Sequence, residues 1–267
     1  MRLKLPDNQR LAAIGLDYAD GHHVEPHDHP QAQLLYAATG LMRLVTRQGA
    51  WVIPPTRAVW IPPGTRHEIH MSGEVHMRTL FIRADACPQN LSDCCVLAVT
   101  PLLREMILRC IRWQAQPGEP ALPLLEQLIL LEIATLQRLP LALPLPTDRR
   151  LRAICKALLR HPEHPHTLED WGQQVGASSR TLARLFRQEL GMSYQEWRQQ
   201  LRLTEALPRL LAGENVQSVA TALGYASGRA FSAMFRRLLG ENPREYLQAL
   251  SQLSTLKHQT GRISDAD

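Results

Sequence analysis

Short apolar runs, broken by proline and glycine, make up the first part of the chain from Gly21 to Ala84. Short strands at such close spacing are typical of small antiparallel barrels. We therefore expect a small antiparallel β-barrel built from the runs Gln33–Ala38, Leu41–Thr46, Trp51–Ile53, Val59–Ile61, Glu68–Met71 and Met77–Ile82.

After residue 100 the apolar residues recur every three or four positions, which predicts helices over Leu102–Trp113 and Leu124–Arg138. A proline-rich stretch follows, and it favours an extended linker over a helix. The fold class expected is α+β with two domains. The predicted divisions are a barrel domain (1–90), a helical dimerisation segment (91–139), a linker (140–149), an all-α domain (150–252) and a disordered tail (253–267).

A helix-turn-helix unit is predicted near the start of the all-α domain. Thr167 and Asp170 have the spacing of a capping box, which starts a helix, and Gly176 permits a sharp turn. Ser178 can then cap a second helix that runs to Glu189. The apolar side chains expected to face inwards are Leu168, Trp171, Val175, Leu182, Leu185, Phe186 and Leu190.

The same unit recurs further along the chain, which a chance match would not do. Before the turn the offset is 48 residues: the match pairs Leu168 with Val216, Trp171 with Val219, Val175 with Leu223 and Gly176 with Gly224. After the turn the offset is 49 residues: the match pairs Ser178 with Ser227, Leu182 with Phe231, Phe186 with Phe235, Leu190 with Leu239 and Gly191 with Gly240. One extra residue in the second turn accounts for the change of offset. Tyr194–Leu211 is predicted to be one long connecting helix, in which Pro208 should cause a kink or shift the end.

Composition adds one observation, the distribution of charge. Residues 1–100 hold nine basic and nine acidic side chains, whereas residues 149–250 hold fifteen against nine, a net charge of +6. An arginine excess confined to one segment is expected of a surface that contacts phosphates. The five cysteines are irregularly spaced, which indicates neither a disulfide framework nor a zinc ribbon. Since no apolar run is long enough for a membrane span or a signal peptide, we expect a cytoplasmic protein.

Residues Leu151–Leu250 resemble the DNA-binding domain of the AraC/XylS family of bacterial regulators. The resemblance rests on Thr181–Phe186, Gly191–Tyr194, Trp197–Arg202, Ala220–Ser227 and Phe235–Gly240, with Pro243 and Tyr246. It implies base-reading side chains at Arg180, Ala183, Arg184, Arg229, Ser232 and Ala233. Contacts to DNA phosphates are expected from Ser179, Arg187, Arg236 and Arg237. Because Ala233 stands where the first unit has Arg184, the second unit has less with which to recognise guanine.

Three histidines and a glutamine carry the candidate chemistry of the front half. His27, His29 and Gln33 share parity along a strand, and a later strand can bring His67 beside them. With Gly40 and the turn Trp60–Gly64, this pattern resembles the two cupin motifs, which in that family surround a metal. The resemblance implies that His27, His29, Gln33 and His67 hold a divalent transition metal (Zn, Ni, Fe or Cu). The alternative is a metal-free effector pocket.

Four further histidines fit neither cupin motif. His22, His23, His70 and His76 are expected at the surface or in side-chain packing.

These features favour a transcription regulator that is not an enzyme, with a cupin-like domain that senses a small-molecule or metal effector. The expected partners are promoter DNA, the effector, a second copy of the chain and RNA polymerase, with no membrane. Gln33–Gly40, Trp51–Pro55 and Ala58–Gly64 resemble the subgroup that includes a regulator of nitroimidazole efflux, which implies control of an efflux or detoxification gene. The alternative function is a metal-dependent cupin enzyme, a dioxygenase or isomerase, fused to a DNA-binding domain. Its signature would be an acidic ligand in place of Gln33.

Overall fold

The computed structural model describes residues 9–116, 118–139 and 141–260. Contacts divide the chain into two units, Met1–Ala142 and Leu143–Asp267, and each has a hydrophobic core of its own. The strand β9 (Ala142–Pro144) lies across the boundary.

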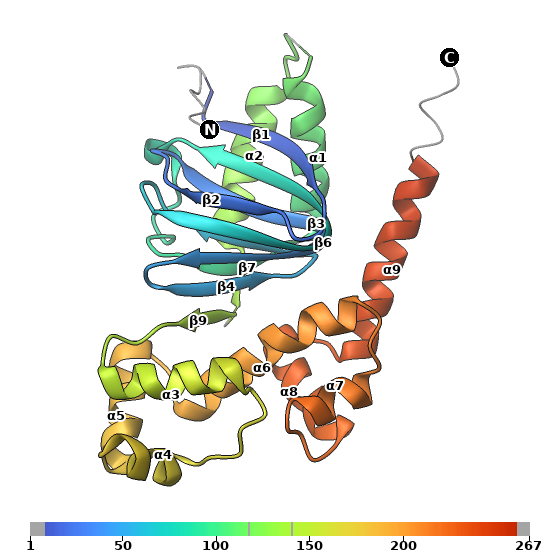
Figure 1. Cartoon of the computed structure of the whole chain (residues 1–267). Helices are drawn as coiled ribbons and strands as arrows, with labels where there is room; N and C mark the ends of the chain where they lie inside the picture. Colours follow the sequence, from blue (N-terminus) through green and yellow to red (C-terminus); the bar gives the residue numbers. More distant parts are fainter. Residues whose placement is uncertain (1–8, 117, 140, 261–267) are drawn as a thin grey trace. The chain divides into compact units, whose positions relative to one another are not determined.

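The first unit is an antiparallel sheet accompanied by two helices (Figure 1). Its elements are β1 (Leu11–Tyr18), β2 (His23–His27), β3 (Ala32–Thr46), β4 (Gly49–Ile53), β5 (Arg57–Ile61), β6 (His67–Ile82), the short helix η1 (Ala84–Ala86), β7 (Cys95–Ala98), α1 (Pro101–Gln114), α2 (Leu122–Thr135) and β8 (Arg138–Leu139). The strand order is β1-β6-β3-β5-β7-β8, while β2 pairs with β6 and β4 pairs with β3. Among the described residues this pairing does not return to β1, so the sheet is open where a closed barrel was expected.

The two longest strands each join two runs that the apolar pattern separates. The first half of β3 pairs with β5 and its second half with β4, while β6 lies along both halves. Gly40, in the middle of β3, has a φ of 71°, and a Cβ there would lie 2.4 Å from the carbonyl oxygen of Glu74. This glycine therefore marks a bend within one strand, at close approach to its neighbour, and not a turn between two strands.

Helices α1 and α2 pack on one face of the sheet (Figure 1). Their buried side chains, such as Ile107 and Ile129, share a core with Leu34 and Trp60 of the sheet. The segment expected to be helical also contributes β7 and β8, which extend the sheet beyond β5. The predicted helix end at Arg138 was wrong, because the chain becomes extended at Leu136 and pairs with β7.

The second unit is helical (Figure 1). Its helices are α3 (Arg149–Arg160), α4 (Leu168–Val175), α5 (Ser179–Leu190), α6 (Tyr194–Leu211), α7 (Val216–Ala222), α8 (Gly228–Leu239) and α9 (Pro243–Thr260). The predicted connecting helix is α6, which ends within one turn of Pro208. Helix α9 continues to Thr260, into the stretch that was expected to be a tail, because an established helix extends more easily than it starts. Residues 261–267 lie outside the described residues.

Candidate functional site

The first helix pair, α4 and α5, is defined by local hydrogen bonds at its ends. The Asp170 carboxylate accepts from the Thr167 amide at 2.8 Å, and this bond holds the pKa of Asp170 below its ordinary value. The Thr167 hydroxyl accepts from the Asp170 amide in return, which completes the predicted capping box. Ser178 caps α5 by accepting from the Thr181 amide at 3.2 Å. The predicted starts of both helices are therefore confirmed.

The turn between α4 and α5 is so tight that it needs a glycine inside α4. A Cβ on Gly172 would lie 2.4 Å from the carbonyl oxygen of Ala177, closer than real Cβ atoms approach. Gly176 then ends α4 in the left-handed region, with a φ of 67°.

A buried hydrogen-bond chain fixes this pair against α6. The Trp171 indole donates to the Tyr194 hydroxyl at 2.8 Å, and that hydroxyl donates to the His166 carbonyl at 2.7 Å. Leu182 and Phe186 of α5 are fully buried in the same core. The orientation of α5 is therefore set by packing, and its other face is left for a partner.

The second helix pair, α7 and α8, repeats this construction. Asn215 caps α7 by accepting from the Gln217 amide at 2.8 Å, and Ser227 caps α8 by accepting from the Ala230 amide at 3.2 Å. Gly224 makes the turn with a φ of 74°. The buried side chains Val219, Leu223, Phe231, Phe235 and Leu239 stand at the positions that the repeat predicts.

The predicted DNA-contacting residues all lie on α5 or α8. On α5, Arg180, Arg184 and Arg187 are exposed while Ser179 and Ala183 are half-buried; on α8, Arg229, Ala233, Arg236 and Arg237 are exposed while Ser232 is half-buried. Two of these arginines are held by glutamines. The Arg184 guanidinium donates to Gln188 at 2.7 Å, along α5, and that of Arg237 donates to Gln199 of α6 at 2.6 Å.

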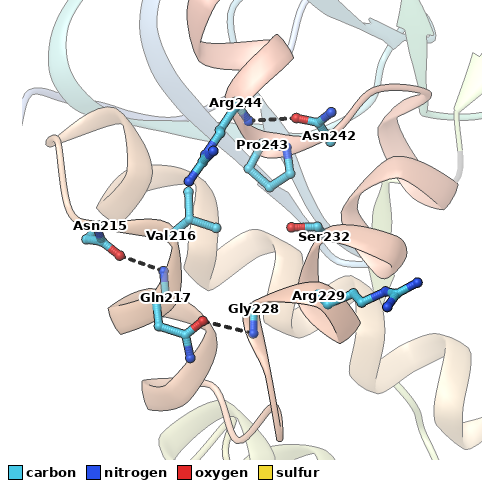
Figure 2. Close-up of a pocket in the computed structure, with 9 residues that line it drawn as sticks. All are labelled: Asn215, Val216, Gln217, Gly228, Arg229, Ser232, Asn242, Pro243 and Arg244. Atoms are coloured by element: carbon cyan, nitrogen blue, oxygen red, sulfur yellow. Dashed lines mark hydrogen bonds between the residues drawn. The ribbon is translucent and has the colours of Figure 1, made fainter.

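A pocket of about 480 Å³ lies where the first residues of α7, α8 and α9 meet (Figure 2). Its lining residues are Asn215, Val216, Gln217, Gly228, Arg229, Ser232, Asn242, Pro243 and Arg244. The Gln217 side chain accepts from the Gly228 amide at 3.1 Å, and Asn242 accepts from the Arg244 amide at 3.0 Å. Two arginines and no acidic residue line this pocket, so its lining is positive, and the Glu245 carboxylate lies beside it, accepting from the Asn242 amide at 2.9 Å.

The sequence reasoning placed Arg229 and Ser232 at a contact surface but missed the rest of this pocket. Asn215 and Asn242 could have been found from the sequence, because asparagine is a preferred residue at the start of a helix. Arg244 follows Asn242 in the first turn of its helix.

The inner histidine cluster consists of His27, His29 and His67, whose ligand atoms all lie within 4.8 Å of one another. In each ring Nδ1 is close to a backbone carbonyl oxygen. The partner of His27 is Glu25 at 2.8 Å, that of His29 is Gln31 at 2.7 Å, and that of His67 is Thr65 at 2.8 Å. A carbonyl oxygen only accepts, so these contacts place the ring proton on Nδ1 and leave the lone pair on Nε2. Metal-binding histidines commonly have this outer contact.

His67 has the most perturbed environment in the cluster. Burial, with smaller contributions from the neighbouring His27 and His29, lowers the pKa of His67 to about 4, so the ring is neutral at physiological pH. Its Nε2 atom is buried and forms no hydrogen bond within the described part of the chain. A buried lone pair without a partner is costly, so this atom has the capacity to accept a ligand.

Gln33 faces the same cluster through its carbonyl oxygen. Its amide nitrogen donates to the Thr79 hydroxyl at 2.8 Å, and that hydroxyl donates to the Leu34 carbonyl, so the Gln33 oxygen points to His29 Nε2 at 3.1 Å. Two lone pairs then face each other. A cation between them would relieve this repulsion, so the imidazole and amide donors fit a divalent transition metal.

Comparison with known proteins identifies the class. A family model described as a helix-turn-helix domain matches residues 171–249, from within α4 into α9. The HTH-type transcriptional regulator NimR of Escherichia coli (strain K12) is 35% identical over 85% of this chain and 84% of its own length. The arabinose operon regulatory protein of the same strain is 31% identical over 73% of this chain and 62% of its own. The protein is therefore a DNA-binding transcription regulator and not an enzyme.

The similarity to NimR extends over most of both chains, so this chain belongs to the AraC/XylS family. Among solved structures, ToxT from Vibrio cholerae O395 matches with a TM-score of 0.38 and 11% identity, over 90% of this chain and 98% of ToxT. No helix in the described residues is long and apolar enough to cross a membrane.

Proposed function

We propose that both helix pairs bind DNA as helix-turn-helix units, with α5 and α8 in successive major-groove segments. The observation that carries this is the exposure of Arg180 and Arg184 on α5, a helix whose opposite face packs on α6 through the ring contact of Phe186 with Tyr194. The base-reading residues proposed are Arg180, Ala183 and Arg184 in the first pair, and Arg229, Ser232 and Ala233 in the second. Arginine can bond two acceptors of guanine at once, so the first pair supplies more of the specificity.

Contacts to DNA phosphates are assigned to Ser179, Arg187, Arg236 and Arg237. The pocket shown in Figure 2 is a further phosphate contact, because it is positive and adjoins Arg229. These contacts carry no sequence information, but they fix the register of the protein on the duplex.

The inner histidine cluster is proposed as the sensor site. Nε2 of His27, His29 and His67, with the Gln33 oxygen, would hold a divalent transition metal (Zn, Ni, Fe or Cu), which supplies a positive centre for their lone pairs. The buried, unpartnered Nε2 of His67 supports a ligand of this kind. An organic effector in the same place is the second candidate. The sequence resemblance to the nitroimidazole-efflux subgroup favours an efflux or detoxification gene as the target.

Dimerisation is proposed through α2. Leu124, Leu128 and Leu131 follow one another at helical spacing and are 64%, 55% and 65% exposed in the single chain. Burying this apolar stripe against a second copy would also bring two DNA-binding units together, which raises their joint affinity for paired half-sites.

The direct test is binding of the full-length protein to duplex DNA from its own upstream region, with footprinting and a salt series. Affinity should fall by about tenfold or more across a fourfold rise in salt, because several phosphates are neutralised. His29→Ala serves as the matched control, expected to lose metal from the inner histidine cluster but keep DNA binding. A flat salt response, or no protected sequence, would contradict the proposal.

A further inference from the structure

A second group of potential metal ligands lies on the opposite face of the same two strands. His23 pairs with His70 and His27 pairs with His67 along β2 and β6, and the register shifts between them. Side chains alternate along β6, so Glu68 and His70 point away from the buried His67. The bulge in β2 lets that strand put His27 on the inner face and His23 on the outer one. The outer cluster is His23, Glu68 and His70.

The three side chains of the outer cluster converge on one small volume. The rings of His23 and His70 stack with centroids 4.2 Å apart and planes 8° apart. The two Nε2 atoms each lie 3.4 Å from an oxygen of the Glu68 carboxylate. Strong hydrogen bonds of this kind measure about 2.7–3.2 Å, so these contacts are long. Nε2 of His23 is buried and forms no hydrogen bond within the described residues.

These spacings match a bound metal better than direct hydrogen bonds. Two ligands that are each about 2.1 Å from a zinc ion stand roughly 3.4 Å apart at the tetrahedral angle. The local charge also suits a cation. Glu25 lies 3.5 Å from Nδ1 of His23, where it can orient the ring, and Glu25 and Glu68 together outweigh Arg43, which stands opposite His70 on β3.

We propose that His23, Glu68 and His70 form a second metal site, for zinc or a similar divalent transition ion, distinct from the inner histidine cluster. Two imidazoles and a carboxylate are a common ligand set for such ions and leave a fourth position for water. An ion there would clamp β2 to β6 and so stabilise the strands that carry His27 and His67.

The experiment is a Zn²⁺ titration of the full-length, tag-free His29→Ala protein, followed by calorimetry and metal analysis after gel filtration. This background removes an inner ligand, so its result does not depend on whether the inner cluster holds metal. About one zinc ion per chain should remain bound. Adding Glu68→Gln or His70→Ala should weaken this binding by at least about tenfold. Co²⁺ in place of Zn²⁺ should give the intense visible absorption of a tetrahedral site.

The matched control is His76→Ala, because His76 is also on β6 and faces a single carboxylate, Glu74, at 3.5 Å. It should leave zinc binding unchanged. Circular dichroism establishes that each variant is folded, and Glu68→Gln preserves the shape of the side chain. Absence of zinc from the His29→Ala protein, equal binding in the Glu68→Gln variant, or an equal loss in the control would each overturn the second site.

Discussion

The two helix pairs share one construction but differ in what they present to a partner. Both have capped helices, a left-handed glycine in the turn and a phenylalanine-centred core. The first pair presents Arg184 where the second has Ala233, while the second pair adjoins the positive pocket. The repeated core maintains the scaffold, and in the proposed function the few exposed positions divide into base-reading and phosphate-contacting residues.

The turns differ as well. The first turn brings the Ala177 carbonyl against Gly172. The residue of the second pair that corresponds to Gly172 is Ala220. The backbone bond that closes the turn is the same in both pairs, from Ala177 N to the Gly172 carbonyl and from Tyr225 N to the Ala220 carbonyl, each at 3.0 Å. The turns therefore differ in the residue at this position and in the one extra residue that follows in the second pair.

The largest effect should come from the shared core. Phe186→Ala and Phe235→Ala each remove a fully buried ring at equivalent positions, so each should lower the free energy of unfolding by about 3–5 kcal/mol. Denaturant unfolding measures both. A cost below about 1 kcal/mol for either variant would show that its pair does not depend on the repeated core.

The turn difference predicts a smaller effect that is confined to the first pair. Gly172→Ala should destabilise the protein by roughly 1–3 kcal/mol, because the added methyl overlaps the Ala177 carbonyl. The reciprocal change, Ala220→Gly, adds no overlap and should cost only about 1 kcal/mol, through helix propensity. Thermal unfolding of the two variants separates these effects. If Gly172→Ala were neutral, the tight turn would be refuted.

The division of work predicts an effect on binding and not on stability. Arg184→Ala should lose about 1–3 kcal/mol of discrimination at one base position. Arg237→Ala should weaken binding to all DNA sequences alike. It should also reduce the salt dependence of the affinity by about the share of one phosphate contact. Competition binding with a panel of single-base variants compares the two proteins. Indistinguishable panels would remove the functional difference between the pairs.

Local signals made the helical unit predictable. The capping box at Thr167, the cap at Ser178 and the apolar spacing of both pairs depend on residues a few positions apart. The sheet was harder, since β2 is a mostly polar segment that becomes a strand only by pairing with β6. Gly40 resembles a turn residue in the sequence but lies inside β3. A glycine is needed there because the neighbouring strand approaches closely.

The candidate sites divide in the same way. The sequence grouped the inner histidines by parity along one strand, and that reason was wrong, because β2 ends at His27 and His29 lies in the loop before β3. The structure nevertheless brings His27, His29 and His67 together. The orientation of Gln33 depends on Thr79, which is distant in sequence and therefore invisible to local pattern. The outer cluster depends on a β-bulge, whose position no local pattern marks, so His23 and His70 could only be assigned to the surface or to packing.

Selection from randomised duplex DNA by the full-length protein tests the central claim most directly. If both helix pairs read successive major-groove segments, the enriched sequences should contain two tracts whose centres are about one helical turn, roughly 34 Å, apart. The tract that depends on Arg184 should be the more conserved, and Arg184→Ala should relax that tract alone. Enrichment of a single tract that Arg184→Ala leaves unchanged would contradict the account.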